Sequence, residues 1–471
     1  MIRSHLLRRA LVAVSALALA ASACRSSSEP IPPSLPLIIP EPERPAQAPA
    51  PAEDAAAAAA TRVISPSGDD DARGTTDAPW RTLAHAAAEV RPGDTVRVRP
   101  GSYQSFVLEQ SGEPDRPIRF LAEPGTIIDD PTHLDGINLE EVSHVEIRGF
   151  RVRGAERAGI RAVECAHVTI RDNVVEKNGK WGILTGFCDD LQIIGNEASR
   201  SREQHGIYVG NTSARPQVKR NAIWGNRLAG LHLNGDVHMG REGVITEAKI
   251  VGNVIHGNGR AGAAGINLDG VRNALIANNL LYANGASGIA VYRIDGGAPS
   301  TGNAIVHNTV VMPPKGARWA ILLRDGATHT ALYHNIVVSE DPRRGAIAAT
   351  RDSLRGLESD ANLLTGRLSL DGGDTIIDLA AWREHTGQDG HSRAAPAAEA
   401  IFVDASSGDF RPGPDSPARG AGRPLPDRLR ERLVNLTAED LAGRARPDAP
   451  DLGCFQLAAS AARPDAAGGD G

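Results

Sequence analysis

The chain has 471 residues, enough for one large domain or two ordinary ones, yet aromatic residues make up only 4% of it while glycine occurs 50 times. This composition argues against a conventional core rich in aromatic side chains. The formal net charge of −6 gives no reason to expect a nucleic acid or an anionic membrane surface as a partner.

The first 23 residues have the pattern of an export signal. Three arginines precede an apolar run over residues 10–21, and Ala21-Ser22-Ala23 is a small-residue cleavage site. Cys24 follows directly, which resembles the lipidation motif of bacterial lipoproteins, although Ala21 stands where that motif usually has leucine. We expect lipidation of Cys24, with simple cleavage before it as the alternative. The protein is then an outer-membrane lipoprotein or a periplasmic or extracellular protein.

Residues 24–61 are rich in proline, alanine and glutamate and show no apolar periodicity. Such a composition cannot bury enough apolar surface to fold, so we expect a disordered tether. A tether after a lipidated cysteine would hold a folded domain away from the membrane, whereas a leader without a role is the alternative. No other stretch is apolar for long enough to span a bilayer.

A short repeated signature dominates the middle of the chain, over residues 131–365. It consists of Gly or Ala, then Ile or Leu, any residue, and an apolar residue, and its copies are separated by 23 to 35 residues. A second marker, an asparagine between short β-branched runs as in "IRDNVV", recurs in step. The signatures begin at residues 136, 159, 182, 206, 230, 265, 288, 320 and 346, and the asparagines are 173, 196, 221, 253, 279, 308, 335 and 362.

These repeats predict an all-β fold. Runs of three to five residues rich in Val and Ile, broken by Gly and Asn, are typical of short strands with tight turns. One strand at the signature and two around the asparagine make three per repeat. Stacked at the usual strand spacing of about 4.8 Å, they form a single right-handed parallel β-helix, for which we expect about nine to eleven coils. Asparagine suits the recurrent turn because it tolerates left-handed backbone angles.

With these strands and this asparagine ladder, the chain resembles the pectate-lyase-like superfamily of right-handed parallel β-helix proteins, over roughly residues 62–456. By this resemblance, residues 62–130 are an N-terminal cap and the first coils, with a helix over Pro79–Val90 that plugs the open end. Residues 366–460 would be an irregular C-terminal cap containing "DLGCFQ", and residues 461–471 a disordered tail. The resemblance implies a polysaccharide-active protein, and membership alone does not specify a reaction.

Two cysteines occupy the same position in adjacent repeats, because Cys165 and Cys188 each lie six residues after their signature glycine. Their Cα atoms would be about 5 Å apart, which is within disulfide reach. An exported compartment permits a disulfide, and a pair of stacked, buried thiols is the equal alternative. We expect Cys454 to be unpaired and buried.

The strand that follows each signature glycine has an inward and an outward face. Positions one and three after the glycine are apolar and point inward, so positions two and four point outward. One outward column is Asn138, Arg161, Leu184, Tyr208, His232, Asn267, Ala290 and Leu322, and the other is Glu140, Val163, Gly186, Gly210, Asn234, Asp269, Tyr292 and Arg324.

Groups able to transfer protons or bind sugars are concentrated in four middle coils of this face, beginning with "GLHLNGD" at residues 230–236. In these coils the glycine-to-asparagine interval grows from 14 or 15 residues to 23 after Gly230 and to 20 after Gly288. Such insertions would wall the strand face into a groove. A merely solvated face is the alternative. The candidates for catalysis are His205, Tyr208, His232, Asp236, Asp269 and Tyr292, and those for substrate binding are Trp181, Asn234, Asn267, Arg293, Asp295, Trp319 and Arg324.

The residue types fit a polysaccharide lyase best. A lyase neutralises a uronate carboxylate, removes the neighbouring proton and protonates the leaving oxygen. Arg293 or Arg324 could meet the carboxylate, His205 or His232 act as base, and a tyrosine act as acid. Trp181 and Trp319 could offer stacking faces to sugar rings. Calcium could be held by the oxygen donors Asn234, Asp236, Asn267 and Asp269.

Two alternatives stay open. A glycoside hydrolase needs two carboxylates across the scissile bond, which Asp236, Asp269 and Asp295 could supply. However, the chain lacks the double-Asp and Gly-His-Gly motifs that the resemblance would require of a polygalacturonase. It also lacks the motifs of β-helix alginate epimerases and calcium-dependent pectate lyases. The third reading is a glycan-binding or structural surface lipoprotein without catalysis. We expect a monomer whose partner is a uronate-containing polysaccharide.

Overall fold

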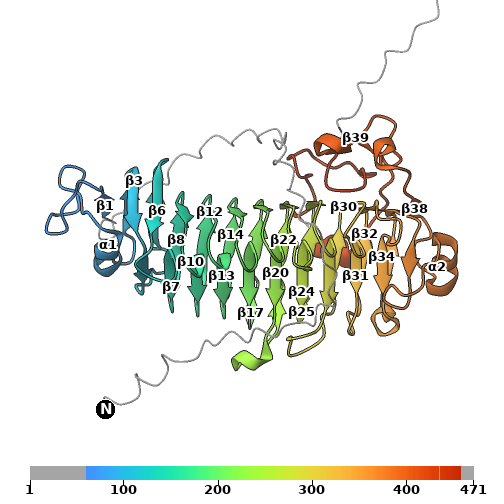
Figure 1. Ribbon diagram of the computed structural model, residues 1–471, viewed down its shortest axis with the longest axis horizontal. Helices are drawn as coiled ribbons and strands as arrows, with labels where there is room; N and C mark the ends of the chain where they lie inside the picture. Colours follow the sequence, from blue (N-terminus) through green and yellow to red (C-terminus); the bar gives the residue numbers. More distant parts are fainter. Residues whose placement is uncertain (1–59, 434, 458–471) are drawn as a thin grey trace, which may run out of the picture. The chain divides into compact units, whose positions relative to one another are not determined.

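The computed structural model describes residues 60–433 and 435–457, so the signal, Cys24 and most of the tether lie outside the described residues. Short parallel strands stack into three long sheets, which turn about one axis as a right-handed β-helix (Figure 1). The sheets contain 11, 12 and 12 strands, so there are about twelve coils. This exceeds the nine to eleven expected, because the segment before residue 131 already supplies strands to all three sheets.

Sheet I is formed by the strands that follow the signature glycines. Each of its strands pairs in parallel with the equivalent strand of the next coil. Its members are β4 (Phe106–Leu108), β7 (Ile137–Glu140), β10 (Ala158–Val163), β13 (Trp181–Gly186), β16 (Ile207–Gly210), β20 (Leu231–Asn234), β24 (Ile266–Asp269), β28 (Ile289–Tyr292), β31 (Ile321–Leu323), β34 (Ile347–Ala349) and β37 (Leu368–Ser369).

Sheet II precedes the asparagine turn in each coil, and sheet III follows it. Sheet II comprises β1 (Thr61–Ile64), β2 (Thr95–Val98), β5 (Ile118–Ala122), β8 (Ser143–Arg148), β11 (Ala166–Arg171), β14 (Gln192–Ile194), β18 (Gln217–Lys219), β22 (Lys249–Val251), β26 (Leu275–Ala277), β29 (Ala304–Val306), β32 (Ala331–Tyr333) and β35 (Glu358–Asp360). Sheet III comprises β3 (Gly101–Gln104), β6 (Thr126–Asp130), β9 (Arg151–Arg153), β12 (Val174–Glu176), β15 (Glu197–Ser199), β19 (Ala222–Trp224), β23 (Val254–His256), β27 (Leu280–Tyr282), β30 (Thr309–Met312), β33 (Ile336–Ser339), β36 (Leu363–Leu364) and β38 (Arg393–Ala394).

The interior of the coil is aliphatic, as the alternation predicts. In β16 and β20 the paired residues Ile207 and Leu231 are fully buried, and so are their inward neighbours Val209 and Leu233. Because every residue pairs with its equivalent in the next coil, one column of side chains continues from coil to coil. The register therefore confirms both the inward columns and the two outward columns of sheet I.

Asparagine side chains connect successive coils at the turn between sheets II and III. Asn221, for example, donates from its Nδ2 to the carbonyl of Ile193 (2.9 Å) and to Oδ1 of Asn253 (2.9 Å), while its own Oδ1 accepts the backbone N–H of Asn196 (2.9 Å). All of these groups are buried, so the ladder satisfies polar atoms that water cannot reach. A second ladder, not predicted from the sequence, lies in the turn that precedes sheet I, at Asn226, Asn258 and Asn284.

The helix expected over Pro79–Val90 is shorter, α1 (Leu83–Glu89). The Thr82 hydroxyl accepts the backbone N–H of His85 (3.1 Å), which caps the first turn. Leu83, Ala86 and Ala87 are buried in the same cluster as the coil interior. That this helix plugs the open end stays a prediction.

The three described cysteines are free thiols. Cys165 and Cys188 are both buried and lie at equivalent positions of adjacent coils, so the alternative of stacked thiols describes this structure and the disulfide does not. Cys454 is fully buried and unpaired, as expected.

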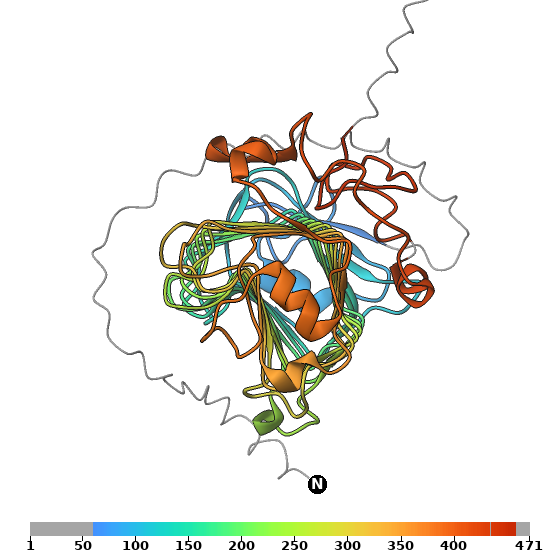
Figure 2. The same cartoon turned by 90° about the vertical axis from the view of Figure 1, so that its right-hand side faces the viewer.

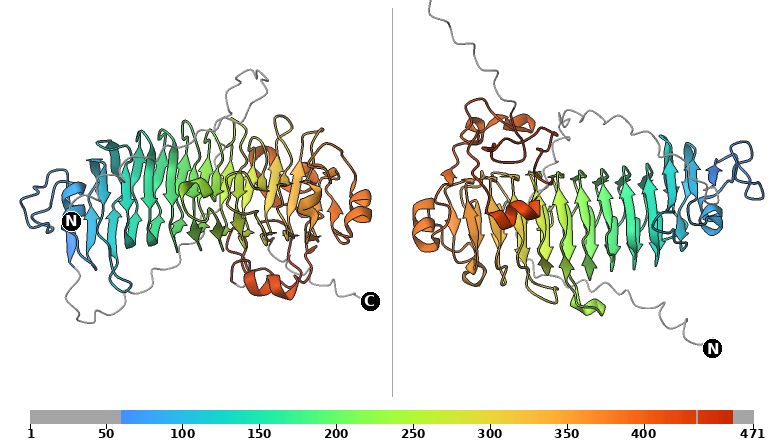
Figure 3. Two further views of the ribbon diagram at one scale, coloured as in Figure 1. Left: turned by 90° about the horizontal axis from the view of Figure 1, so that it is seen from below. Right: turned by 180° about the vertical axis from the view of Figure 1, so that it is seen from behind.

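The C-terminal segment returns along the outside of the coil. The helix α2 (Leu379–Thr386) lies across the last coil, with Trp382 fully buried (Figure 2). The chain then forms the hairpin of β39 (Phe402–Asp404) and β40 (Asp409–Pro412), and α3 (Asp427–Leu433) lies against sheet II (Figure 3). No helix among the described residues is both long enough and apolar enough to cross a bilayer.

A buried histidine pair anchors this returning segment. His334 Nδ1 lies 3.1 Å from His307 Nε2, and His334 Nε2 accepts the backbone N–H of Arg423 (3.0 Å). Burial and the nearby Arg446 charge lower the pKa of His334 to about 4. The neutral form of His334 is therefore the one that holds Arg423.

We expect Asn221→Ala to lower the free energy of unfolding by about 3 kcal/mol, because it leaves several buried polar groups without partners, each worth about 1–3 kcal/mol. Urea unfolding followed by circular dichroism measures this change. Gln192→Ala, at a half-buried position on β14, is the control and should cost well under 1 kcal/mol. Equal effects of the two substitutions would contradict the role of the ladder.

We expect the stability that His334 contributes to be present above pH 6.5 and lost between pH 6.5 and 4. The unfolded histidine binds its proton with a pKa of about 6.5, so acid favours the unfolded chain, by up to about 3 kcal/mol at pH 4. Urea midpoints at pH 7 and pH 4.5 measure this. In His334→Gln, which can still accept the Arg423 N–H, the midpoints should differ less. An unchanged difference would refute the assignment.

Candidate active site

The middle four coils of sheet I bring most of the predicted site residues together. The register places Tyr208, His232 and Asn267 side by side in one outward column, on β16, β20 and β24. In the second column, Asn234 and Asp269 are paired, and Tyr292 follows on β28. Each neighbour is one strand spacing away, about 5 Å.

A hydrogen-bonded chain of three side chains runs across these coils. His205 Nε2 lies 3.3 Å from His232 Nδ1, and His232 Nε2 lies 3.4 Å from the Tyr292 hydroxyl. The His205 and His232 rings meet edge to face, with centroids 4.7 Å apart. The chain thus connects a residue before β16 to the end of β28.

A single backbone group determines the tautomers of this chain. The N–H of Ala229 donates to His205 Nδ1 (3.1 Å), so the neutral His205 ring must carry its proton on Nε2. That proton is donated to His232 Nδ1, which leaves the His232 proton on Nε2, facing the Tyr292 oxygen. Burial lowers the pKa of His232 to about 3 and that of His205 well below its usual value. Both rings are neutral at pH 7.

Tyr208 and Asn234 form a second hydrogen-bonded pair beside this chain. Asn234 Nδ2 donates to the Tyr208 hydroxyl (3.0 Å) and lies 3.4 Å from Oδ2 of Asp295. Burial raises the pKa of Tyr208 to about 12, and it raises the pKa of Tyr292 further. Both phenols are therefore protonated at neutral pH. Each accepts a hydrogen bond at its oxygen and keeps its own proton available for donation.

The side chain of Asp269 is bound by backbone N–H groups of the loop after β28. Its carboxylate accepts the backbone N–H groups of Ile294 (2.9 Å), Asp295 (2.9 Å) and Gly296 (3.0 Å), and its side chain is buried. Burial raises the pKa of Asp269 to about 6, against the lowering effect of these N–H groups. The prediction that Asp269 acts in catalysis or metal binding is not supported by this geometry, because both oxygens already hold the loop after β28.

The two inserted loops contact each other next to these strands. The N–H of Val237 donates to the Asp295 carbonyl (3.1 Å), and the N–H of Gly297 donates to the Gly243 carbonyl (2.8 Å). Asp236 begins the short helix η1 (Val237–Met239) by accepting the N–H of His238 (2.9 Å). Asp236 is thus engaged in the loop, and Asp295 is the carboxylate that the loops present to Asn234.

The prediction that Trp181 and Trp319 stack on sugar rings is wrong. Trp181 and Trp319 have exposed fractions of only 5% and 3%, so neither offers a ring face to solvent. The ring of Trp181 instead lies beside that of Tyr208, with centroids 6.1 Å apart.

The predicted arginines lie at the margin of the cluster. Arg293 is exposed and donates from Nε to the Gly296 carbonyl (3.0 Å), and Arg324 is exposed and pairs with Asp325 (3.1 Å). Asn267 is 7% exposed, and its amide has no side-chain hydrogen bond to any residue that the structure describes. The structure therefore brings together His205, Tyr208, His232, Asn234, Asn267, Tyr292 and Asp295.

A calcium ion does not fit the four oxygen donors that the sequence suggested. Both Asp269 oxygens accept backbone N–H groups, Asp236 caps η1, and Asn234 turns its amide nitrogen toward Tyr208. Calcium needs six to eight converging oxygens. Across residues 60–433 and 435–457, no three His, Cys, Asp or Glu side chains are grouped to hold a metal. We derive no step through a metal ion.

Sequence comparison places the chain among β-helix proteins. Residues 62–200 match the family described as Pel9A-like, right handed beta helix region, and residues 135–310 and 203–353 match the right handed beta helix region family. Both matches describe the right-handed β-helix that the structure shows. The uncharacterized protein YwoF of Bacillus subtilis (strain 168) is 31% identical over 165 residues, which cover 34% of this chain and 28% of that relative.

Two solved structures share the fold at low sequence identity. Pectate lyase Pel9A superposes with a TM-score of 0.56 at 16% identity, over 84% of this chain and 97% of that chain. XylC, solved in complex with xylose, superposes with a TM-score of 0.51 at 11% identity, over 85% and 98% of the two chains. These likenesses show the β-helix architecture of this chain.

We expect ¹⁵N NMR of the full chain to show His205 and His232 as neutral rings protonated on Nε2 from pH 7 down to pH 5. The Ala229 N–H and the low pKa values of the two rings determine this result. Two-dimensional spectra that correlate ring nitrogens with ring protons report the tautomers. A charged ring at pH 6, or a proton on His232 Nδ1, would contradict the proposed hydrogen-bonded chain.

Proposed function

We propose that this chain is a polysaccharide lyase that acts on a uronate-containing glycan along the outer face of sheet I. The observation that carries the proposal is the pair of protonated, half-buried phenols, Tyr208 and Tyr292, each held by a hydrogen bond to its oxygen. A phenol held in this way can protonate a leaving oxygen. The similarity in fold to pectate lyase Pel9A supports the same substrate class.

In the proposed reaction, Tyr292 is the general acid. It gives its proton to the leaving glycosidic oxygen, and the His232 Nε2–H bond stabilises the phenolate that remains. His205 does not contact substrate in this scheme, because both of its ring nitrogens are already engaged. It is a positioning residue that keeps the His232 proton on the nitrogen facing Tyr292.

The base is assigned to Asp295. Its Oδ2 lies 3.4 Å from the Asn234 amide, and Oδ1 has no partner in the part of the chain that the structure describes. Asp295 removes the proton from the carbon next to the uronate carboxylate. The electron pair of that C–H bond forms the C=C bond, and the C–O bond breaks. The Asn267 amide, which lacks a side-chain partner, is positioned to donate to the uronate carboxylate.

The hydrolase alternative has less support. It needs two free carboxylates on either side of a sugar bond, yet Asp269 is bound to three backbone N–H groups and Asp236 caps η1. A glycan-binding protein without catalysis would also need the outer face of sheet I to be exposed. It would not need the hydrogen bonds that connect His205, His232 and Tyr292. Activity with substrate therefore decides between these functions.

We expect Tyr292→Phe to lower the rate of unsaturated-product formation at least a hundredfold, because general acid catalysis contributes about 10²–10⁴ in rate. Residues 61–471 would be tested on pectates, alginates, glycosaminoglycans and neutral glycans, and product would be followed by absorbance of the new double bond.

The matched control is Tyr282→Phe, which changes a half-buried tyrosine on sheet III that is stacked on His256. This variant should keep full activity. Reducing ends without unsaturated product would indicate a hydrolase instead. Activity of Tyr292→Phe equal to that of Tyr282→Phe would exclude Tyr292 as the acid.

A further inference from the structure

A cavity lies beyond the ends of the sheet I strands, on the coils that follow the candidate active site. Its volume is about 500 Å³, within the range of small-molecule binding sites. Its residues come from four successive turns. Arg272 pairs with Thr301, Thr301 pairs with Thr328, and the N–H of His329 donates to the carbonyl of Arg355 in the following turn (2.9 Å). Four coils span about 14 Å along the axis, roughly three sugar units.

The charge of this cavity is unbalanced. Three arginines line it (Arg272, Arg351 and Arg355) against one aspartate, Asp352. Asp352 already accepts the hydroxyl proton of Thr350 (2.5 Å). None of the three guanidinium groups forms a hydrogen bond or ion pair with any residue that the structure describes, and the buried Nε of Arg272 has no partner among these residues.

Guanidinium groups that share a cavity without carboxylate partners repel one another. Arg351 and Arg355 are exposed to water, whereas Arg272 is half-buried. Some arginines of the coil are paired with carboxylates, such as Arg157 with Asp135 and Arg215 with Asp190, whereas the three in this cavity are not. An oxyanion accepts the planar fork of arginine in two parallel hydrogen bonds, which makes it the group that would complete this cavity.

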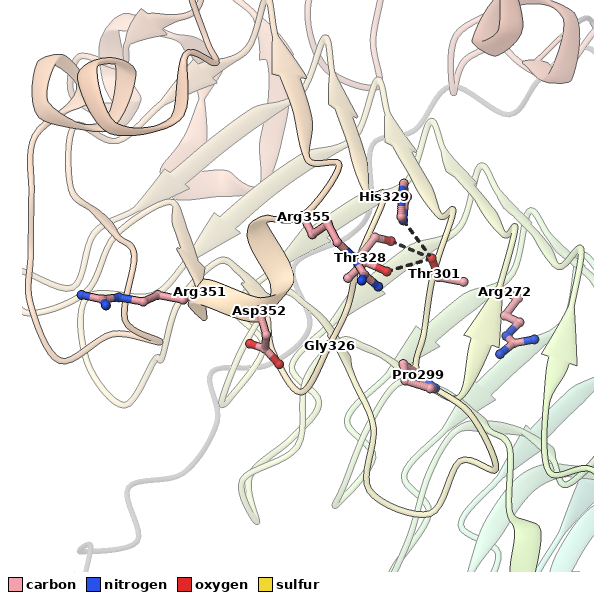
Figure 4. A pocket seen from close by; sticks show the side chains of 9 residues that line it. All are labelled: Arg272, Pro299, Thr301, Gly326, Thr328, His329, Arg351, Asp352 and Arg355. Carbon is pink, nitrogen blue, oxygen red and sulfur yellow. Dashed lines mark hydrogen bonds between the residues drawn. The ribbon is translucent and has the colours of Figure 1, made fainter.

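The close view separates the three arginines (Figure 4). Thr301 and Thr328, whose hydroxyls are 3.0 Å apart, lie between the side chains of Arg272 and Arg355. The side chain of Arg351 extends away from this group. Arg272 and Arg355 therefore flank the Thr301–Thr328 pair, and Arg351 is a natural control.

One loop links the cavity to the candidate active site. Pro299 and Thr301 line the cavity, while Ser300 between them donates from its hydroxyl to the Tyr292 carbonyl (2.9 Å). The same loop carries Asp295. A glycan chain that reaches the tyrosines could thus extend to the arginines along neighbouring coils.

We propose that Arg272 and Arg355 form an anion-binding subsite that takes a carboxylate or sulfate group of an acidic glycan, outside the proton-transfer site. The choice of a glycan as the source of the anion rests on the proposed function. The binding of an oxyanion by these two arginines does not, since it follows from the unpaired charges of the cavity.

The test is titration calorimetry on the full chain with a galacturonate hexamer, with inorganic sulfate and with a neutral maltose hexamer. We expect Arg272→Ala/Arg355→Ala to bind the galacturonate hexamer at least tenfold more weakly than wild type. Arg351→Ala should bind it as wild type does. Sulfate should compete with the galacturonate hexamer for binding to wild type. The affinity for the neutral maltose hexamer should be the same in wild type and in every variant.

The proposal would be overturned if the double variant and Arg351→Ala bound the galacturonate hexamer equally well. It would also be overturned if wild type bound neither the galacturonate hexamer nor sulfate. Sulfate binding that depends on Arg272 and Arg355, without hexamer binding, would identify a free inorganic anion and remove the glycan from the proposal. Hexamer binding that depends on both arginines in a protein without lyase activity would support the subsite and refute the proposed reaction.

Discussion

Parallel register between successive coils is the constraint on which the rest of this structure depends. Each residue of sheet I is paired with its equivalent in the next coil, as Tyr208 is paired with His232, so side chains far apart in the sequence become neighbours. The buried asparagine ladders hold the turns at the same pitch and leave no room for a slip of one residue. A slip would turn His232 inward and bury it in an aliphatic interior.

The same register supplies an environment that changes the chemistry of ordinary groups. Burial among the stacked coils disfavours the charged forms of His205 and His232, and both rings stay neutral for that reason. In this setting one backbone N–H, that of Ala229, sets the direction of a hydrogen-bonded chain that ends at Tyr292. Proton transfer to a sugar oxygen needs such a preorganised donor.

The sequence was sufficient to predict the fold and the face that carries the site. The signature spacing and the recurring asparagines predict three strands per coil, and alternation from Gly230 predicts the columns that contain His232 and Asn234. The predicted number of coils is lower than the number in the structure, because the segment from Thr61 to Asp130 has strands without the signature.

What the sequence could not predict depends on loops and backbone groups. Nothing in the residue types indicates that Asp269 accepts three N–H groups from the loop after β28. Likewise, the cavity between Arg272 and Arg355 is formed by residues more than 80 positions apart, in turns of unequal length. Such convergence requires coordinates.

The most direct test of the central claim is product analysis by mass spectrometry after reaction with an acidic polysaccharide in H₂¹⁸O. Elimination breaks the C–O bond without adding water. The account therefore predicts unsaturated products, one water lighter than hydrolysis products, that take up ¹⁸O only by slow exchange at the reducing-end carbon. Saturated products carrying one ¹⁸O at the cleaved bond would show hydrolysis and would contradict the proposed roles of Tyr292 as acid and Asp295 as base.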